Sequence, residues 1–196
     1  MCNKRLNIDS SCCYQRYCRW VAVSITVYSF DVNFVHSRNY QRHFDIIWAS
    51  PDCTQYSIAR TTAKTPRNFE RADALVSACV EIIKYLQPRC FFIENPDSGL
   101  LKHRCCINYL PYVRVDYCMY GKPYRKRTRI WTNMGDTWRP KLCDRQHLVS
   151  GRHEAAAQRG RTERYCHKFS RDQLHRLPEA LCQEIFDVCV QCHVMP

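Results

Sequence analysis

Glycine is scarce in this sequence. The chain has five glycines in 196 residues, and the first of them is Gly99. A nucleotide-type cofactor is usually cradled by a glycine-rich turn between a strand and a helix, because glycine lets the backbone approach the ligand closely. If this protein binds such a cofactor, the glycine-rich loop is missing or replaced.

Long apolar runs, internal repeats and low-complexity tracts are also missing. No apolar run approaches the roughly 20 residues that span a bilayer, and residues 1–5 lead into no signal-like segment. We therefore expect an intracellular protein that does not contact a membrane. In that compartment its 15 cysteines should be thiols, most of them passive core residues.

Positive charge, by contrast, is abundant. The 30 lysines and arginines outnumber 18 acidic residues, which gives a formal net charge of +12. A surplus of this size indicates a polyanionic partner; nucleic acid is favoured, and a solvated basic surface is the alternative. The length favours one domain with a substantial core.

The segment 44–57 organises the chain. Residues 44–50 form an apolar run rich in branched and aromatic side chains, which predicts a buried strand. Pro51 ends that strand, because proline cannot donate a ladder hydrogen bond. Cys53 follows at the carboxyl end of the strand, where open α/β sheets bind ligands. We interpret Cys53 as a nucleophile; the alternative is one more small, buried apolar residue.

A helix and a second strand follow. Thr65 and Pro66 have the pattern of an N-cap and a first helical residue. Apolar residues then recur at intervals of three and four and form one face: Phe69, Ala72, Leu75, Val76, Cys79, Ile82, Ile83 and Leu86. The run 90–93 predicts a strand that stops at Glu94. Strand, helix and strand at this spacing form a βαβ unit, so Cys53 and Glu94 should emerge side by side at one sheet edge.

Two further strands flank a basic turn. Residues 113–120 and 127–133 predict a hairpin joined across residues 121–124. Cations and aromatic residues are interleaved there, which is typical of a surface that contacts phosphates and bases. The cations are Lys122, Arg125, Lys126, Arg127 and Arg129, and the aromatic residues are Tyr124 and Trp131. Near the amino terminus, residues 21–30 predict another strand, which Asp31 follows.

These elements divide the chain into four parts. Residues 1–20 are an irregular N-terminal segment, 21–138 the core, 139–169 a short, basic, loop-rich insert, and 170–196 a C-terminal helix that packs back on the core. A capping box is predicted at residues 170–173. The predicted fold class is α/β: a Rossmann-like sheet with parallel strands, helices on its faces and a C-terminal β-hairpin.

The insert and the C-terminal part contain residue types that bind zinc. They are Cys143, His147, His153, Cys166 and His167, together with the pair Cys189 and Cys192. Zinc sites usually use two closely spaced ligand pairs at regular spacing, and the spacing here is irregular. We therefore predict no metal site, and core or incidental thiols instead.

Three motifs, in this order, resemble those of the cytosine-5 DNA methyltransferase family. The nucleophile motif of that family, Pro-Cys followed by Gln, any residue, Phe and Ser, is similar to residues 52–57. Its Glu-Asn-Pro motif, which closes a strand, matches residues 94–96. Its Gln-x-Arg-x-Arg motif, which follows a Tyr-Gly-x-Pro turn, resembles residues 125–129 after residues 120–123. The resemblance covers residues 31–133 and predicts a methyltransferase sheet.

The resemblance implies a mechanism. Carbon 5 of cytosine is a poor nucleophile, so the thiolate of Cys53 would first add to carbon 6 and so activate carbon 5 toward the methyl group of S-adenosylmethionine. Glu94 would assist at the ring nitrogen N3. Arg127 and Arg129 would hold the base and neighbouring phosphates and lower the pKa of the Cys53 thiol. The target base must leave the duplex to reach these residues.

The resemblance also implies binding roles. Asp31 matches the position that contacts the adenine amino group of S-adenosylmethionine, and Pro51 and Asn95 are the other implied cofactor contacts. The implied partner is DNA. Its contacts would come from the basic turn, through Lys122, Tyr124, Arg125 and Lys126.

The chain departs from the family pattern at several positions. The family's Phe-x-Gly-x-Gly loop and the ribose-binding acid after it are not recognisable, and the recognition region is short. Asp52 stands in place of proline, and its carboxylate should raise the pKa of the neighbouring thiol. Arg125 stands in place of glutamine. We therefore expect a truncated or divergent N-terminus, and an inactive chain unless a missing N-terminal segment or a partner chain completes the cofactor site.

Two other functions stay open. One is a non-catalytic nucleic-acid-binding remnant, which would keep the basic hairpin but bind no cofactor. The other is an amino-methyltransferase, which would grip an exocyclic amine with the turn at residues 50–52 and would need neither Cys53 nor Glu94.

Overall fold

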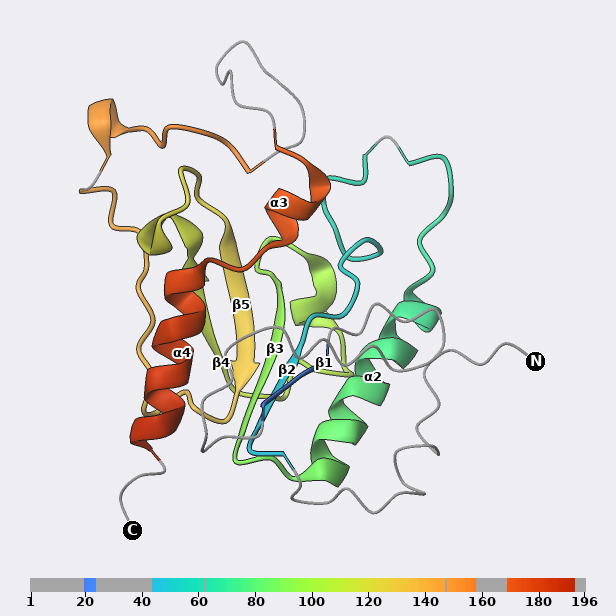
Figure 1. Cartoon of the computed structure of the whole chain (residues 1–196). Coiled ribbons are helices and arrows are strands. Elements are labelled where there is room, and N and C mark those ends of the chain that lie inside the picture. The colour runs from blue at the N-terminus through green and yellow to red at the C-terminus, as the bar shows by residue number, and fades with distance from the viewer. Residues whose placement is uncertain (1–19, 24–43, 62, 147, 158–168, 193–196) are drawn as a thin grey trace.

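The computed structural model describes residues 20–23, 44–61, 63–146, 148–157 and 169–192 (Figure 1). All statements about the structure concern these residues. The predicted cofactor contact Asp31 lies outside them, as does most of the strand predicted at 21–30.

The described strands form one mixed sheet of five strands, in the order β1-β2-β3-β5-β4. The strands are β1 (Trp20–Val23), β2 (Ile46–Ala49), β3 (Cys90–Pro96), β4 (Tyr112–Asp116) and β5 (Arg127–Thr132). β1, β2 and β3 are parallel, whereas β5 is antiparallel to both of its neighbours. This arrangement of a parallel part and helices is consistent with the α/β fold of methyltransferases.

The prediction of a βαβ unit is confirmed. β2 and β3 are parallel neighbours, and α2 (Phe69–Leu86) connects them in the sequence. The helix starts later than expected, because Asn68 caps it: the Asn68 side chain accepts a hydrogen bond from the Arg71 N–H at 2.9 Å. Thr65, the expected cap, instead accepts a hydrogen bond from the guanidinium of Arg60 at 2.6 Å.

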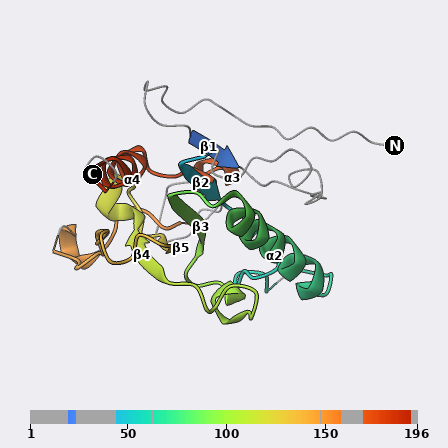
Figure 2. The ribbon, with the colours of Figure 1, turned by 90° about the horizontal axis from the view of Figure 1, so that it is seen from below.

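The two faces of the sheet carry separate apolar clusters. Successive residues of a strand point to opposite faces, so Ile47 packs with Val76 of α2, whereas Ile46 packs with Leu181 of α4 (Glu179–Gln191). Figure 2 shows α2 and α4 on opposite sides of the sheet. The helices thus cover both faces and leave the carboxyl ends of β2 and β3 between them.

The prediction of a sheet of parallel strands is only partly correct, because the C-terminal strands make the sheet mixed. β4 and β5 pair antiparallel, as the predicted hairpin requires. β5 also pairs antiparallel with β3, so β5 lies between β3 and β4 in the sheet. This pairing extends β3 through Pro96, so Glu94 and Asn95 lie within a strand and not after it.

Short helices complete the described fold. They are η1 (Leu100–His103), η2 (Tyr117–Tyr120), η3 (Val149–Gly151) and α3 (Arg171–His175). The predicted capping box is confirmed: Ser170 and Gln173 hydrogen-bond to each other's backbone N–H. Neither α2, with its 18 residues, nor the shorter helices of the described segments have the apolar length that a bilayer crossing requires.

Candidate active site

Cys53 lies in a turn that its own neighbours define. The carbonyl of Cys53 accepts a hydrogen bond from the Tyr56 N–H at 3.1 Å, which closes the turn. The Asp52 carboxylate accepts hydrogen bonds from the N–H and the hydroxyl of Thr54, at 3.0 and 2.6 Å. Such a side-chain-to-backbone bond two residues along is the Asx-turn that aspartate favours. The half-buried thiol is therefore held directly after β2.

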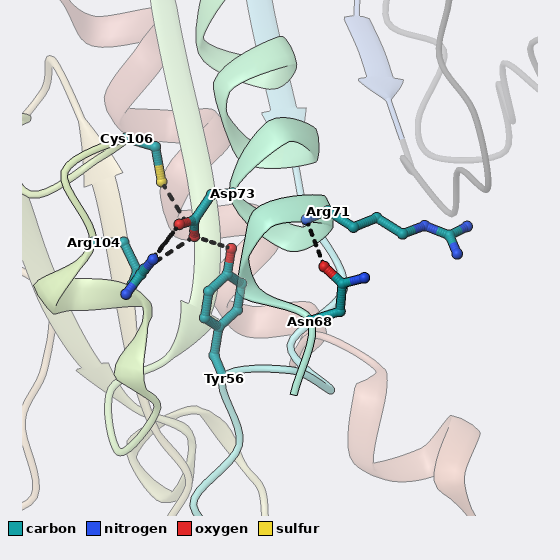
Figure 3. Close-up of polar contacts among 6 residues, drawn as sticks. All are labelled: Tyr56, Asn68, Arg71, Asp73, Arg104 and Cys106. Atoms are coloured by element: carbon teal, nitrogen blue, oxygen red, sulfur yellow. Dashed lines mark hydrogen bonds and ion pairs between the residues drawn. The ribbon is translucent and has the colours of Figure 1, made fainter. Parts of the chain in front are cut away.

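A buried polar network anchors this turn to α2 (Figure 3). The hydroxyl of Tyr56, a residue with no exposed surface, donates a hydrogen bond to Asp73 at 2.9 Å. Arg104 binds the same carboxylate through Nε and Nη2, at 2.9 and 2.5 Å. Burial raises the pKa of Asp73, but the hydrogen bonds from Arg104 and Tyr56 outweigh it and hold the pKa below its usual value. The turn is thus joined to the helix by an ionised carboxylate.

A second bond joins the turn to β3. Asn95 is buried, and its side-chain N–H donates to the carbonyl of Pro51 at 2.9 Å. The Asn95 Oδ1 atom is also buried, and it has no hydrogen-bond partner within the described part of the chain. Asn95 and Pro51 were predicted to contact the cofactor; in this structure they hold the ends of β2 and β3 together.

Glu94 lies beside this turn with a cation and a phenol. It is 8% exposed. The hydroxyl of Tyr117 donates to Glu94 Oε1 at 3.4 Å, and Lys126 Nζ lies 3.9 Å from the same oxygen. Burial and the charge of Glu94 raise the pKa of Tyr117 well above its usual value, so the phenol stays protonated and can donate. Lys126 also lies over the Tyr117 ring, 4.8 Å from its centroid.

The thiol of Cys53 lies in an environment that favours its protonated form. Burial, the carboxylate of Glu94 and that of Asp52 raise the Cys53 pKa, and Lys126 opposes them. The effect of Asp52 has the direction expected from the sequence. Lys126 is the nearby cation that lowers this pKa, whereas Arg127 and Arg129 pair with other carboxylates.

Arg127 makes an ion pair across the hairpin with its partner residue in β4, Asp116. Its Nε and Nη2 atoms lie 3.0 and 2.5 Å from the carboxylate of Asp116, and Nε of Arg125 lies 3.2 Å from it. Asp116 has no exposed surface and also accepts a hydrogen bond from the Cys143 N–H at 2.9 Å. Burial raises the pKa of Asp116, but these bonds, that of Arg127 foremost, hold it below its usual value.

Arg129 points to a different carboxylate. Its Nε atom lies 2.8 Å from Asp97 Oδ1, and its guanidinium lies 3.7 Å from the centroid of the exposed Tyr112 ring. The two arginines that the sequence grouped together share one face of β5, but they have separate partners: Asp116 ends β4, and Asp97 follows β3.

Of the residues predicted to bind nucleic acid, Tyr124 is misassigned. It is 1% exposed, packs edge-on against Phe169 at 5.0 Å between ring centroids, and has no ring face available to a base. Arg125 and Lys126 make the contacts within the chain described above. Lys122 is half-buried in the turn between η2 and β5.

We predict that the reactivity of Cys53 depends on the two nearby charges of opposite sign. The Asp52→Asn variant keeps the hydrogen-bond acceptor for Thr54 but removes a negative charge, so the Cys53 pKa should fall; Lys126→Met should raise it. The measurement is the rate of Cys53 alkylation by iodoacetamide against pH, read by mass spectrometry. Asp136→Asn, at an exposed position, is the control. Equal profiles for all variants would contradict the prediction.

The fold and this site define an α/β protein of the methyltransferase type, with a thiol and a carboxylate at neighbouring strand ends. The chain belongs to the C-5 cytosine-specific DNA methylase family, whose family model matches residues 7–108. The resemblance seen in the sequence is thereby confirmed. Members of this family use S-adenosylmethionine to methylate cytosine in DNA.

A curated relative supports the same assignment. The chain is 35% identical, over 169 residues, to a protein of Frog virus 3 (isolate Goorha) named "Probable DNA (cytosine-5)-methyltransferase". The alignment covers 76% of this chain and 77% of that protein.

Proposed function

We propose that this protein is an S-adenosylmethionine-dependent DNA (cytosine-5)-methyltransferase in which Cys53 adds to carbon 6 of an extruded cytosine. The observation that carries the proposal is the position of Cys53 and Glu94. Cys53 follows β2, Glu94 lies near the carboxyl end of the adjacent parallel strand β3, and the Glu94 carboxylate raises the pKa of the Cys53 thiol. A thiol and a buried carboxylate are the two groups that nucleophilic addition to a cytosine ring requires.

The proposed addition moves one proton. A bond forms between Cys53 Sγ and carbon 6, the thiol loses its proton, and the ring nitrogen N3 gains one. In this proposal Glu94 would supply the proton to N3, and its own contacts with Lys126 and Tyr117 would hold it in position. Because the resting thiol is mostly protonated, the addition should be faster when Lys126 is charged and near it.

S-adenosylmethionine would supply the methyl group that carbon 5 receives. Pro51 and Asn95 would hold it, together with Asp31 from outside the described residues. The buried Oδ1 of Asn95 has no hydrogen-bond partner among the described residues, and this supports a polar ligand beside the turn, since buried acceptors rarely lack a donor.

DNA is the proposed substrate, and the net charge of +12 would draw it to the protein through the phosphates. Lys122, Arg125 and Arg129 are the proposed phosphate contacts. Arg125 would then have to exchange its ion pair with Asp116 for one with a phosphate. Its guanidinium is only half-buried, so it can make this exchange at the surface.

Covalent trapping tests the proposal. Duplex DNA that contains 5-fluorocytosine should form an adduct with the protein in the presence of S-adenosylmethionine, because fluorine on carbon 5 blocks the release of the thiol. The adduct should survive a denaturing gel and be absent with Cys53→Ser. Cys192→Ser, at an exposed position of the C-terminal segment, is the matched control and should still form it.

The other outcomes discriminate between functions. Binding of DNA without any adduct, and without binding of S-adenosylmethionine by calorimetry, would make the protein a non-catalytic nucleic-acid-binding protein. Methylation that survives Cys53→Ser would favour an amino-methyltransferase that uses the turn at residues 50–52.

A further inference from the structure

Three potential metal ligands from separate segments meet beside the basic turn. Cys118 belongs to η2, Cys143 follows β5 in the loop of the insert, and His153 follows η3. Their ligand atoms all lie within 4.8 Å of one another, and each side chain is half-buried. Among the described residues this is the one cluster of this kind.

The spacing within the cluster suits zinc. Cys143 Sγ lies 3.5 Å from His153 Nε2. Zinc binds thiolate sulfur at about 2.3 Å and imidazole nitrogen at about 2.0–2.1 Å, so two such ligands of a tetrahedral ion are about 3.5 Å apart. A hydrogen bond between thiol and imidazole would give a similar separation for one pair, but it would not require the third sulfur.

We propose that Cys118, Cys143 and His153 bind a zinc ion. Two thiolates and an imidazole are a soft donor set that favours zinc over calcium or magnesium. They fill three of the four tetrahedral positions, and the fourth is left for water or another donor. The irregular spacing that argued against a metal site in the sequence involved the insert and the C-terminal part, whereas one of the three ligands, Cys118, comes from η2.

The site would join the insert to the hairpin formed by β4 and β5. The Cys143 N–H already donates to Asp116, and the Ala155 N–H donates to the carbonyl of Pro123 at 2.9 Å. A metal bound between these two bonds would fix residues 141–155 along the turn at residues 117–124. It would also hold the loop that keeps Asp116 with Arg127. The role is structural and independent of the proposed methyl transfer.

Metal analysis of protein purified without chelator tests the proposal. We expect close to one zinc per chain, loss of that zinc in the Cys118→Ser/Cys143→Ser double variant, and retention in Cys192→Ser. Removal of zinc by a chelator should lower the melting temperature of the wild-type chain and leave that of the double variant unchanged. Cobalt(II) added to the zinc-free chain should give a thiolate charge-transfer band, and His153→Cys should keep the ion and intensify that band.

The contrary results are equally definite. Absence of zinc together with no cobalt band in the reduced wild-type protein would overturn the proposal. So would zinc that persists in the double variant, since the ion would then lie elsewhere. If the double variant fails to fold, His153→Ala replaces it: retention of full zinc content and an unchanged cobalt spectrum in that variant would likewise overturn the site.

Discussion

The Glu94→Gln variant should form the covalent adduct with 5-fluorocytosine DNA about 10²- to 10⁴-fold more slowly than the wild-type protein. Glutamine has the shape of glutamate and can keep a hydrogen bond from Tyr117, but its amide cannot transfer a proton to N3 during addition of the thiol. The expected loss is the usual contribution of a positioned acid or base to a rate. Single-turnover adduct formation, sampled by denaturing gel, measures it.

The control for this variant is Glu179→Gln. Glu179 is exposed at the start of α4, so its neutralisation should leave the rate unchanged. Thermal melting of both variants separates a catalytic loss from an unfolded chain. Wild-type adduct formation in Glu94→Gln, with none in Cys53→Ser, would keep Cys53 as the nucleophile and remove Glu94 from the mechanism.

The second large effect is on stability. We expect Asp116→Asn to lower the free energy of unfolding by about 3 kcal/mol, because it leaves the guanidinium groups of Arg125 and Arg127 facing a neutral side chain. This is the low end for a broken buried ion pair, since the two arginines remain 33% and 29% exposed whereas Asp116 is fully buried. In a domain of this size the melting temperature should fall by about 6–12 °C.

The pH dependence of this effect has a definite sign. The pKa of Asp116 in the folded protein lies below its usual value, so its stabilising contribution is complete above the unfolded pKa of about 3.9 and is lost as pH falls toward the folded pKa. The difference between wild type and Asp116→Asn should therefore shrink below about pH 4. Urea unfolding at several pH values measures it.

An exposed aspartate provides the matched comparison. Asp136→Asn, at the exposed turn after β5, should change the free energy of unfolding by less than about 0.5 kcal/mol. Equal stabilities for Asp116→Asn and Asp136→Asn would show that the ion pairs at Asp116 contribute nothing to the folded protein in solution.

Local patterns in the sequence were sufficient to predict the βαβ unit that carries Cys53. The apolar run before Pro51, the helical spacing of apolar residues and the short run before Glu94 are each contained within about 20 residues, and each follows from burial of one face. The order of strand, helix and strand then required β2 and β3 to be parallel neighbours.

The positions of strands that pair with segments distant in the sequence were not predictable in the same way. The placement of β5 between β3 and β4 is set by backbone pairing between segments more than 30 residues apart, for which the sequence of β5 itself has no signal. Tyr124 is buried for the same kind of reason, because it packs against Phe169 and bridges to Ala155, which are both distant in the sequence. A run of cations therefore looked like one surface, although its members have different partners in the fold.

The sequence by itself determined the turn that carries Cys53 after its strand, the strand that carries Glu94, and the family, because these features belong to short segments whose patterns are local. Only the tertiary structure decided that Lys126 lies near enough to lower the pKa of the Cys53 thiol, and that Arg127 and Arg129 pair with Asp116 and Asp97. It also decided that Cys118, Cys143 and His153 meet. The physical reason is that electrostatic and ligand contacts depend on distances in space. The folded arrangement of the elements sets these distances, and the spacing of residues along the chain does not.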